Sequence, residues 1–279
     1  MKFKYVADSC CEFPDFFEDD HDCVRVPLTI NVGKTVFIDD ASLNMNKFLE
    51  SIDEYPKCPK SACPSPELYM KAFEGDADVI FVATLSAELS GSYQSARLAA
   101  TIYEEEHPGK KIHVFNSESA SSGEAQALMK AAEYADMGLS PDEIISKTED
   151  FIHNNMQTFF VLENMEVLRK NGRLSRMKTL AAQALNIKPV CLSVHGVIEQ
   201  AVIARGMAKA LDKMVELSLA KIKDTKDRTL FITHVNCRER AEKVMARYIS
   251  KAEFARTVIL NTAGISSLYA GRGGIIVTF

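Results

Sequence analysis

The sequence predicts a two-domain α/β protein: an N-terminal, largely parallel α/β domain, then a C-terminal α+β domain with a mixed or antiparallel sheet. Two observations support this prediction. Short apolar runs alternate with helical patterns through residue 155, which is typical of βαβ units. Further on, the β-rich runs Lys188–Ser193 and Val197–Val202 are joined by only three residues, which indicates an antiparallel hairpin. No Pro/Gly-rich linker separates the halves, so we expect domains 1–155 and 156–279 to pack directly together.

The first 155 residues should alternate strands with helices. Apolar runs predict the strands Phe3–Ala7, Val24–Asn31, Val79–Thr84 and Ile112–Phe115. Helical patterns predict the helices Met45–Ser51, Pro66–Glu74, Ser90–Glu105, Ser122–Asp136 and Pro141–Asn154. The last helix has the best-marked start, because Ser140 and Glu143 flank Pro141 with the spacing of a capping box.

Residues 156–279 should build a sheet of different design. The expected strands are Thr158–Leu162, Lys188–Ser193, Val197–Val202, Thr229–Thr233, Thr257–Asn261 and Gly274–Thr278. The expected helices are Gly206–Ile222 and Arg238–Ile249. We expect a ligand to bind between this domain and the first one.

Composition excludes several classes of protein. The chain has 279 residues with 33 basic and 38 acidic side chains, and a net charge of −5 disfavours non-specific nucleic-acid binding. No apolar run approaches the ~18–20 residues of a membrane span, and the N-terminus has no signal-peptide pattern, so we expect a cytoplasmic location without stable membrane insertion. The seven cysteines show no zinc spacing, which indicates free thiols. No nucleotide-phosphate loop occurs, and the sequence predicts neither metal nor cofactor.

Three hydroxyl-rich turns are the main candidates for a binding site. The turn that contains Ser90, Gly91 and Ser92 follows a predicted strand and opens a helix, where free backbone N–H groups can bind an anion. Residues 61–66 form a second turn and residues 116–123 a third. For each turn the alternative is that its serines only cap a helix.

Catalysis by one of these serines is a weaker interpretation. The G-x-S-x-G elbow is absent, and neither His113 nor His234 has an obvious partner. Arg173 and Arg205 each lie beside a turn glycine, where an arginine can bind a carboxylate or phosphate. Capping and solvated surface charge are the alternatives for both arginines.

Taken in order, these segments resemble the DegV family over nearly the whole chain. Asp8-Ser9 resembles the family's opening D-S, Pro27-Leu28 its P-L, and Gly33 with Asp39-Asp40 its G…D turn. The longer matches are residues 61–65 with T-S-Q-P-S, 90–96 with S-G-T-Y-x-S-A, 171–175 with G-G-R-I-S and 186–189 with N-I-K-P. Arg205 stands where the family has an arginine after its second-domain hairpin.

The resemblance implies a non-catalytic protein that holds a long-chain fatty acid between two α/β domains. Its carboxylate would be bound by Ser61 and Ser90, with Gly91 and Ser92 as secondary candidates. Some members of the family present the acyl group to a separate fatty-acid kinase, and the resemblance places Arg173 and Arg205 in that partnership. The alternatives are a serine-dependent hydrolase or transferase and a regulatory module that binds another protein.

Three departures from the family pattern bear on the expected function. Ser61 replaces a threonine and keeps its hydroxyl, whereas Ala62 replaces a serine and loses one donor. Asn261 stands where the family has the histidine of H-T-G-x-G. We expect lipid binding to be retained despite these changes. Because Asn makes only neutral hydrogen bonds, we expect support of a fatty-acid kinase to be weak or absent.

Overall fold

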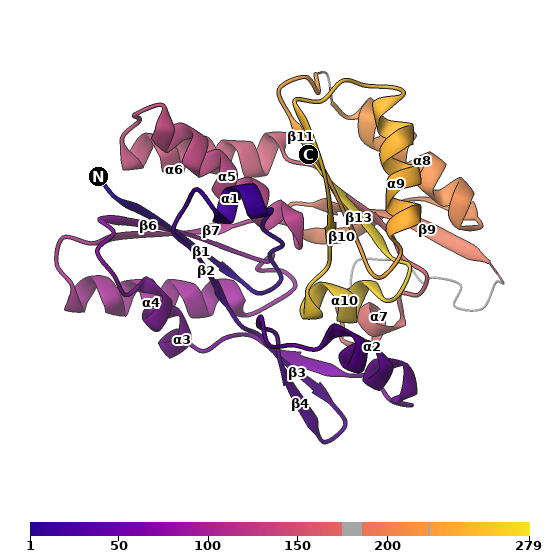
Figure 1. The fold of residues 1–279 in the computed structure, drawn as a ribbon, viewed down its shortest axis with the longest axis horizontal. Helices are drawn as coiled ribbons and strands as arrows, with labels where there is room; N and C mark the ends of the chain where they lie inside the picture. The colour runs from indigo at the N-terminus through magenta and orange to yellow at the C-terminus, as the bar shows by residue number, and fades with distance from the viewer. Residues whose placement is uncertain (175–185, 223) are drawn as a thin grey trace.

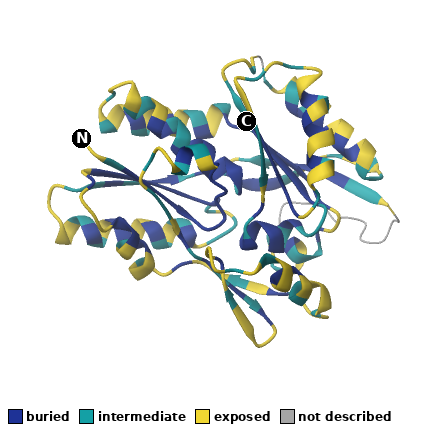
Figure 2. Ribbon diagram, viewed as in Figure 1, coloured by how far each residue is buried: buried dark blue, intermediate teal, exposed yellow. Residues whose placement is uncertain are grey.

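Two large β-sheets lie side by side in the computed structural model, which describes residues 1–174, 186–222 and 224–279. Figure 1 shows the four-stranded sheet on the indigo-to-magenta side and the six-stranded sheet on the orange-to-yellow side. The strands of both sheets are mostly buried, while the outward faces of the helices are exposed (Figure 2). The predicted combination of a parallel and a mixed sheet is confirmed.

The first sheet is parallel throughout, in the order β2-β1-β6-β7. Its strands are β1 (Phe3–Asp8), β2 (Cys23–Val26), β6 (Val79–Thr84) and β7 (Lys111–Asn116). Helices α3 (Pro66–Phe73) and α4 (Ser92–Glu106) cover one face, and α5 (Ser122–Asp136) and α6 (Pro141–Asp150) cover the other (Figure 1). Alternation along β1 sends Tyr5 and Ala7 into one apolar cluster and Val6 into the other.

The second sheet is mixed, in the order β10-β9-β8-β13-β11-β12. Its strands are β8 (Thr158–Val161), β9 (Ile187–Val194), β10 (Val197–Arg205), β11 (Thr229–His234), β12 (Arg256–Asn261) and β13 (Ile275–Thr278). Only β11 and β12 run parallel, and the predicted hairpin is β9–β10. Helices α8 (Met207–Ala220) and α9 (Arg238–Ile249) pack on the sheet.

Several element predictions were wrong. The run Val24–Asn31 is two strands, because the chain leaves the edge of the parallel sheet at Pro27 and Leu28. Beyond Pro27 lies an unpredicted antiparallel sheet, β4-β3-β5, made of β3 (Thr29–Val32), β4 (Thr35–Ile38) and β5 (Lys60–Ala62). The predicted helix from Pro141 ends as α6 at Asp150 and continues as a π-helix, Phe151–Asn155.

Three short helices were also missed: α1 (Asp15–Glu18), α7 (Glu166–Lys170) and α10 (Gly264–Ala270). Helix α2 (Met45–Glu54) was predicted, and it contacts α10. One apolar cluster therefore combines Ile30 and Phe48 with Leu168 and Leu268 from the C-terminal half. A domain boundary between residues 155 and 156 stays a prediction.

Serine and threonine hydroxyls join the two large sheets. Ser119, Ser121 and Ser122, at the start of α5, each lie against a threonine of the second sheet. The oxygen–oxygen distances are 2.6 Å to Thr158, 2.8 Å to Thr233 and 2.9 Å to Thr278, respectively. Because a hydroxyl both donates and accepts, each pair satisfies two buried polar groups. Three of the four serines of the third turn thus form hydrogen bonds with the second sheet.

The buried carboxylate of Asp39 holds α10 in place. Its oxygens accept the backbone N–H groups of Gly264 (2.7 Å) and Ile265 (2.9 Å) at the start of α10, and the hydroxyl of Ser9 (2.8 Å). A β-carbon at position 264 would lie 2.5 Å from Asp39 Oδ1, so only glycine fits there. A negative charge at the helix N-terminus also complements the helix dipole.

Among the described residues, no helix is both long and apolar enough to cross a membrane.

We predict that Asp39→Ala lowers the free energy of unfolding by roughly 3 kcal/mol, because a buried donor left without a partner costs about 1–3 kcal/mol and three would be affected. Asp40→Ala is the matched control, since among the described residues the exposed carboxylate of Asp40 accepts hydrogen bonds only from neighbouring Ser42. Its expected effect is below about 1 kcal/mol. Urea unfolding of both variants measures the difference, and equal midpoints would contradict this role of Asp39.

Candidate functional site

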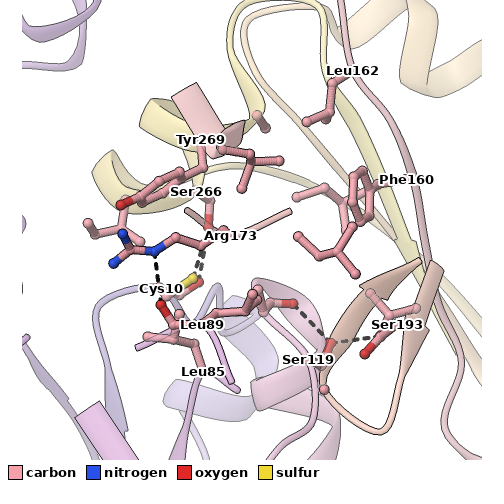
Figure 3. A pocket seen from close by; sticks show the side chains of 18 residues that line it. Cys10, Leu85, Leu89, Ser119, Phe160, Leu162, Arg173, Ser193, Ser266 and Tyr269 are labelled. Carbon is pink, nitrogen blue, oxygen red and sulfur yellow. Dashed lines mark hydrogen bonds between the residues drawn. The ribbon is translucent and has the colours of Figure 1, made fainter. Parts of the chain in front are cut away.

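A narrow apolar cavity of about 100 Å³ lies between the two halves of the chain (Figure 3). Leu85, Leu89 and Ala120 from the first half line it opposite Phe160, Leu162 and Ile276 from the second. Side chains on the C-terminal edge of the parallel sheet thus face the second sheet. Ligands in open α/β folds bind beyond this edge of a sheet.

One end of the cavity is polar. There Tyr269 of α10 and Arg173 line the wall, and the guanidinium carbon of Arg173 lies 5.8 Å from the centre of the Tyr269 ring. The hydroxyls of Tyr269 and Ser61 are 2.8 Å apart, which connects β5 to this end. Arg173 Nε donates to the carbonyl of Leu89 at 3.1 Å, and within the described residues Arg173 Nη2 has no hydrogen-bond partner. This end combines hydroxyls with a guanidinium, a set that suits a carboxylate.

The first two hydroxyl-rich turns lie against each other. A β-carbon at Gly91 would lie 3.2 Å from Cys63 Sγ, and Ser95 Oγ donates to the carbonyl of Pro64 at 2.6 Å. The main chain of Ser90 follows Leu89, whose carbonyl Arg173 contacts. Of the predicted residues near this end, only Arg173 is among the described residues that line the cavity. Ser61 is connected to it through the hydroxyl of Tyr269, and Ser90 lies next to the lining residue Leu89 without lining the cavity itself.

The two serines around Gly91 have different surroundings. Ser90 is half-buried, and its Oγ accepts the N–H of Ser92 at 3.2 Å, so α4 begins at Ser92 and not at Ser90 as predicted. Ser92 is fully buried, donates to Asp8 at 2.6 Å and lies 2.6 Å from the hydroxyl of Tyr69. Its side chain thus belongs to a buried network.

Two predicted residues lie apart from this end. Arg205 is exposed at the end of β10, paired with Ile187, and Asn261 is exposed at the end of β12, paired with His234. Neither Arg205 nor Asn261 is among the described residues that line the cavity. Ser175, in the segment that resembles G-G-R-I-S, lies outside the described residues.

Sequence reasoning missed Tyr269 and Ser266 because it did not predict α10. Ser266 also lines the cavity, and its hydroxyl donates to the carbonyl of Cys10 at 3.2 Å. The available signal was the short run Gly264–Ala270 between turn residues. A seven-residue helix rich in serine has too little periodicity to be recognised.

Three buried carboxyl groups surround Cys10, which lines the cavity. Asp8 accepts the N–H groups of Cys10 and Leu85, both at 3.0 Å, as well as the Ser92 hydroxyl. Glu12 accepts the N–H of Ala263 at 2.9 Å. Within the described residues, neither carboxyl oxygen of Glu124 has a hydrogen-bond partner. Burial raises the pKa of Asp8 to about 6, that of Glu12 to about 7 and that of Glu124 well above its ordinary value.

A family model described as "Uncharacterised protein, DegV family" matches residues 2–279. The chain belongs to the DegV family. Within this DegV chain, the segments that resemble D-S and G…D meet, because the hydroxyl of Ser9 donates to Asp39.

Other DegV proteins match over their whole length. A crystal structure of one from Ruminococcus gnavus, with vaccenic acid, is 44% identical, has a TM-score of 0.96 and covers 100% of this chain and 99% of that one. The Streptococcus pneumoniae fatty acid kinase (Fak) B3 protein, loaded with linoleic acid, is 34% identical with a TM-score of 0.85 and the same coverage. A DegV domain-containing protein from Streptococcus pneumoniae is 36% identical over 286 residues, which cover 100% of this chain and 99% of the relative.

We predict that this DegV chain loses stability as pH rises from 5 to 8. The unfolded chain ionises Glu12 near its ordinary value of 4.5, whereas the folded chain keeps the proton up to about pH 7. The folded state therefore binds more protons in this range, and each such carboxyl lowers the free energy of unfolding by about 1.4 kcal/mol per pH unit. Glu12→Gln and Glu124→Gln should flatten the slope, whereas the exposed Glu88→Gln should not. Urea titrations across this range measure it, and an unchanged slope in both buried variants would contradict the prediction.

Proposed function

We propose that this chain binds a long-chain fatty acid in the cavity between its halves, with the carboxylate at the polar end formed by Ser61, Tyr269 and Arg173. The observation that supports this most directly is the cavity itself, which has mainly apolar walls from both halves and a guanidinium beside a tyrosine ring at one end. Burial of an acyl chain contributes about 0.8 kcal/mol per CH₂, so a few polar groups suffice to orient the head. The fatty acids in the structures of its relatives support the same ligand class.

We propose that a guanidinium and hydroxyl groups together bind the carboxylate. Arg173 supplies the charge, since its Nη2 can donate to a carboxylate oxygen, and the paired hydroxyls of Ser61 and Tyr269 can donate to the other oxygen. The hydroxyl of Ser90, which accepts the N–H of Ser92, has its own proton to donate to the carboxylate. Ser90 and Gly91 lie at the start of α4, where backbone N–H groups add to the positive potential. Ser92 takes part indirectly, because its side chain fixes this turn to Asp8. Binding of this kind needs no catalytic residue.

The direct test is mass spectrometry of lipid extracted from the purified protein. We expect a long-chain fatty acid at a substantial fraction of one per chain. The same measurement gives the length of the acyl chain of the bound fatty acid. The absence of an acyl chain, together with turnover of an ester substrate, would favour the serine-hydrolase alternative.

We predict that Ser61→Ala and Ser90→Ala each weaken fatty-acid binding by roughly 1.5–3 kcal/mol, about 10- to 150-fold, because a charge-assisted hydrogen bond is lost. Ser250→Ala, which removes an exposed hydroxyl of a helix end, is the matched control and should leave affinity unchanged. Displacement of a fluorescent fatty acid measures the affinities. If Ser90→Ala lowered stability by about 1 kcal/mol and left affinity intact, Ser90 would serve only the start of α4.

We also propose that this chain gives weak support to a fatty-acid kinase. Arg205 and Asn261 are both exposed and so accessible to a partner, but Asn261 cannot carry the charge of a histidine. The relative named as a fatty acid kinase B3 protein supports the partner class.

Asn261→His should therefore increase acyl phosphorylation when the lipid-loaded protein is supplied with ATP and a fatty-acid kinase from the same source. Asn154→His, an exposed change on the π-helix, is the control and should have no effect. Rapid phosphorylation by the unaltered chain, with no gain in Asn261→His, would contradict the proposed weakness.

A further inference from the structure

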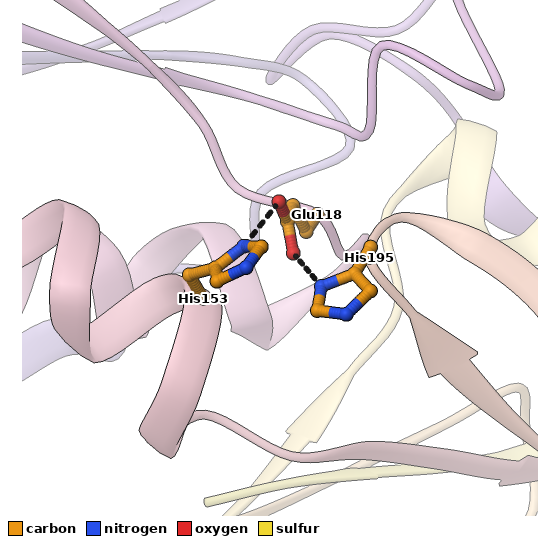
Figure 4. Close-up of side chains that lie close together, drawn as sticks. All are labelled: Glu118, His153 and His195. Atoms are coloured by element: carbon orange, nitrogen blue, oxygen red, sulfur yellow. Dashed lines mark hydrogen bonds and ion pairs between the residues drawn. The ribbon is translucent and has the colours of Figure 1, made fainter.

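A second polar cluster lies next to the cavity, at the junction of the two halves (Figure 4). It consists of Glu118, His153 and His195. The Nδ1 atoms of His153 and His195 lie 3.1 and 3.4 Å from the two carboxylate oxygens of Glu118. The two imidazole rings stack with their centres 4.3 Å apart. Three potential metal ligands therefore lie within 4.8 Å of one another.

Each ligand comes from a different segment, and hydrogen bonds hold the two turns that carry Glu118 and His195. Glu118 lies in the turn after β7, His153 in the π-helix and His195 in the β9–β10 turn. Ser193 Oγ donates to the carbonyl of Glu118 at 2.5 Å, and Ser86 Oγ donates to the carbonyl of Gly196 at 2.8 Å. The hairpin turn is thus fastened to the turn that carries Glu118.

The backbone conformation is unusual at two of the three ligands. Glu118 has φ = 50° and His195 has φ = 49°, in the left-handed region that side chains other than Gly and Asn seldom adopt. Such residues cost on the order of 1–3 kcal/mol and cluster at functional sites. His153 lies in a π-helix, which is also frequent at functional sites. At His195 the positive φ is what a two-residue hairpin turn requires, since Val194 pairs with Val197 and Gly196 also has positive φ. Glu118 is therefore the ligand whose backbone conformation points to a functional site.

The distances are as compatible with a metal centre as with hydrogen bonds, and the 3.1 Å contact of His153 has hydrogen-bond length. An N–H···O bond is usually about 2.7–3.2 Å long, so the 3.4 Å contact of His195 is weak by that measure. In a tetrahedral zinc site, bonds of about 2.0–2.2 Å place neighbouring ligand atoms roughly 3.3–3.5 Å apart. A modest inward shift of the ion-free side chains would place both imidazoles and the carboxylate on one ion.

We propose that Glu118, His153 and His195 form a binding site for a divalent transition-metal ion of the zinc class. Two imidazoles and one carboxylate are ligands that suit such an ion, and three protein ligands leave at least one position for water. The side chains of His153 and His195 are 53% and 60% exposed, so the ion has a path from solvent. Lys221 lines the same hollow, and its positive charge limits the affinity.

Spacing along the sequence could not show this site, because its ligands are separated by 35 and 42 residues and share no short motif. The expectation of no metal followed from that lack of spacing. In the structure, Thr158 and Ser193 line both this hollow and the acyl cavity. A bound ion would therefore fix the β9–β10 turn beside the cavity wall, at the end opposite Arg173 (Figure 3).

The test is titration of the full chain, stripped with EDTA, with Zn²⁺ by calorimetry and with Co²⁺ by visible absorption. We expect one ion per chain and a Co²⁺ spectrum of nitrogen and oxygen ligands in low coordination. His153→Gln, His195→Gln and Glu118→Gln should each weaken binding at least about tenfold, which is the lower range for loss of even a supporting residue of a metal site. Zn²⁺ should raise the melting temperature of the unaltered chain and not that of these variants.

His113→Gln is the matched control, because His113 also pairs with a carboxylate, Glu149 at 3.0 Å, and has no second histidine there. The Zn²⁺ affinity of His113→Gln should equal that of the unaltered chain. If Glu118→Gln fails to fold, the metal affinity of His153→Gln still tests the proposal, because the side chain of His153 is exposed. Unchanged affinity in His153→Gln, or a Co²⁺–thiolate band that shows the ion on cysteine, would overturn the proposal.

Discussion

The structure depends on the hydrogen bonds of two carboxyl groups, Asp8 and Asp39, that are buried in the first part of the chain. Asp8 and Asp39 are at most 4% exposed, and within the described residues neither forms an ion pair. A buried carboxylate is tolerated only when hydrogen bonds replace its water, so each must gather several donors. Asp8 gathers donors from the ends of β1 and β6 and from α4, and Asp39 gathers them from Ser9 and α10. These requirements set the relative positions of segments that are far apart in the sequence.

The polar end of the cavity follows from this arrangement. Asp39 fixes the first turn of α10, and α10 carries Tyr269 toward Ser61 and Arg173. The small sheet contains Ser61 on β5 and leads through β4 into Asp39, so one unit contributes both the anchor of the helix and the hydroxyl that meets it. A change at Asp39 would therefore act on the site through the position of a helix, without any contact with a ligand.

How far the sequence predicts the structure depends on the range of the interactions involved. Apolar runs identified the parallel sheet, and the short Val194–Gly196 connection identified the β9–β10 hairpin. The capping box at Ser140 has both of its expected hydrogen bonds. The small sheet was missed because its three strands are only three or four residues long and one contains polar Ser61. The same limit applies to the site, because Ser61 and Tyr269 are 208 residues apart in the sequence. The sequence also cannot distinguish a serine beside a glycine that binds a ligand, as proposed for Ser90, from one that supports a buried carboxylate, as Ser92 does.

The place of β13 in the second sheet has a consequence for folding. This strand pairs with β8 on one side and β11 on the other, although its residues, Ile275–Thr278, follow all other strands in sequence. During synthesis, domains begin to fold from the N-terminus, so β8 and β11 emerge before the strand that separates them. Contacts between residues distant in sequence also slow folding. The parallel sheet can form early on the ribosome, whereas the cavity wall at Ile276 is completed among the last parts of the molecule.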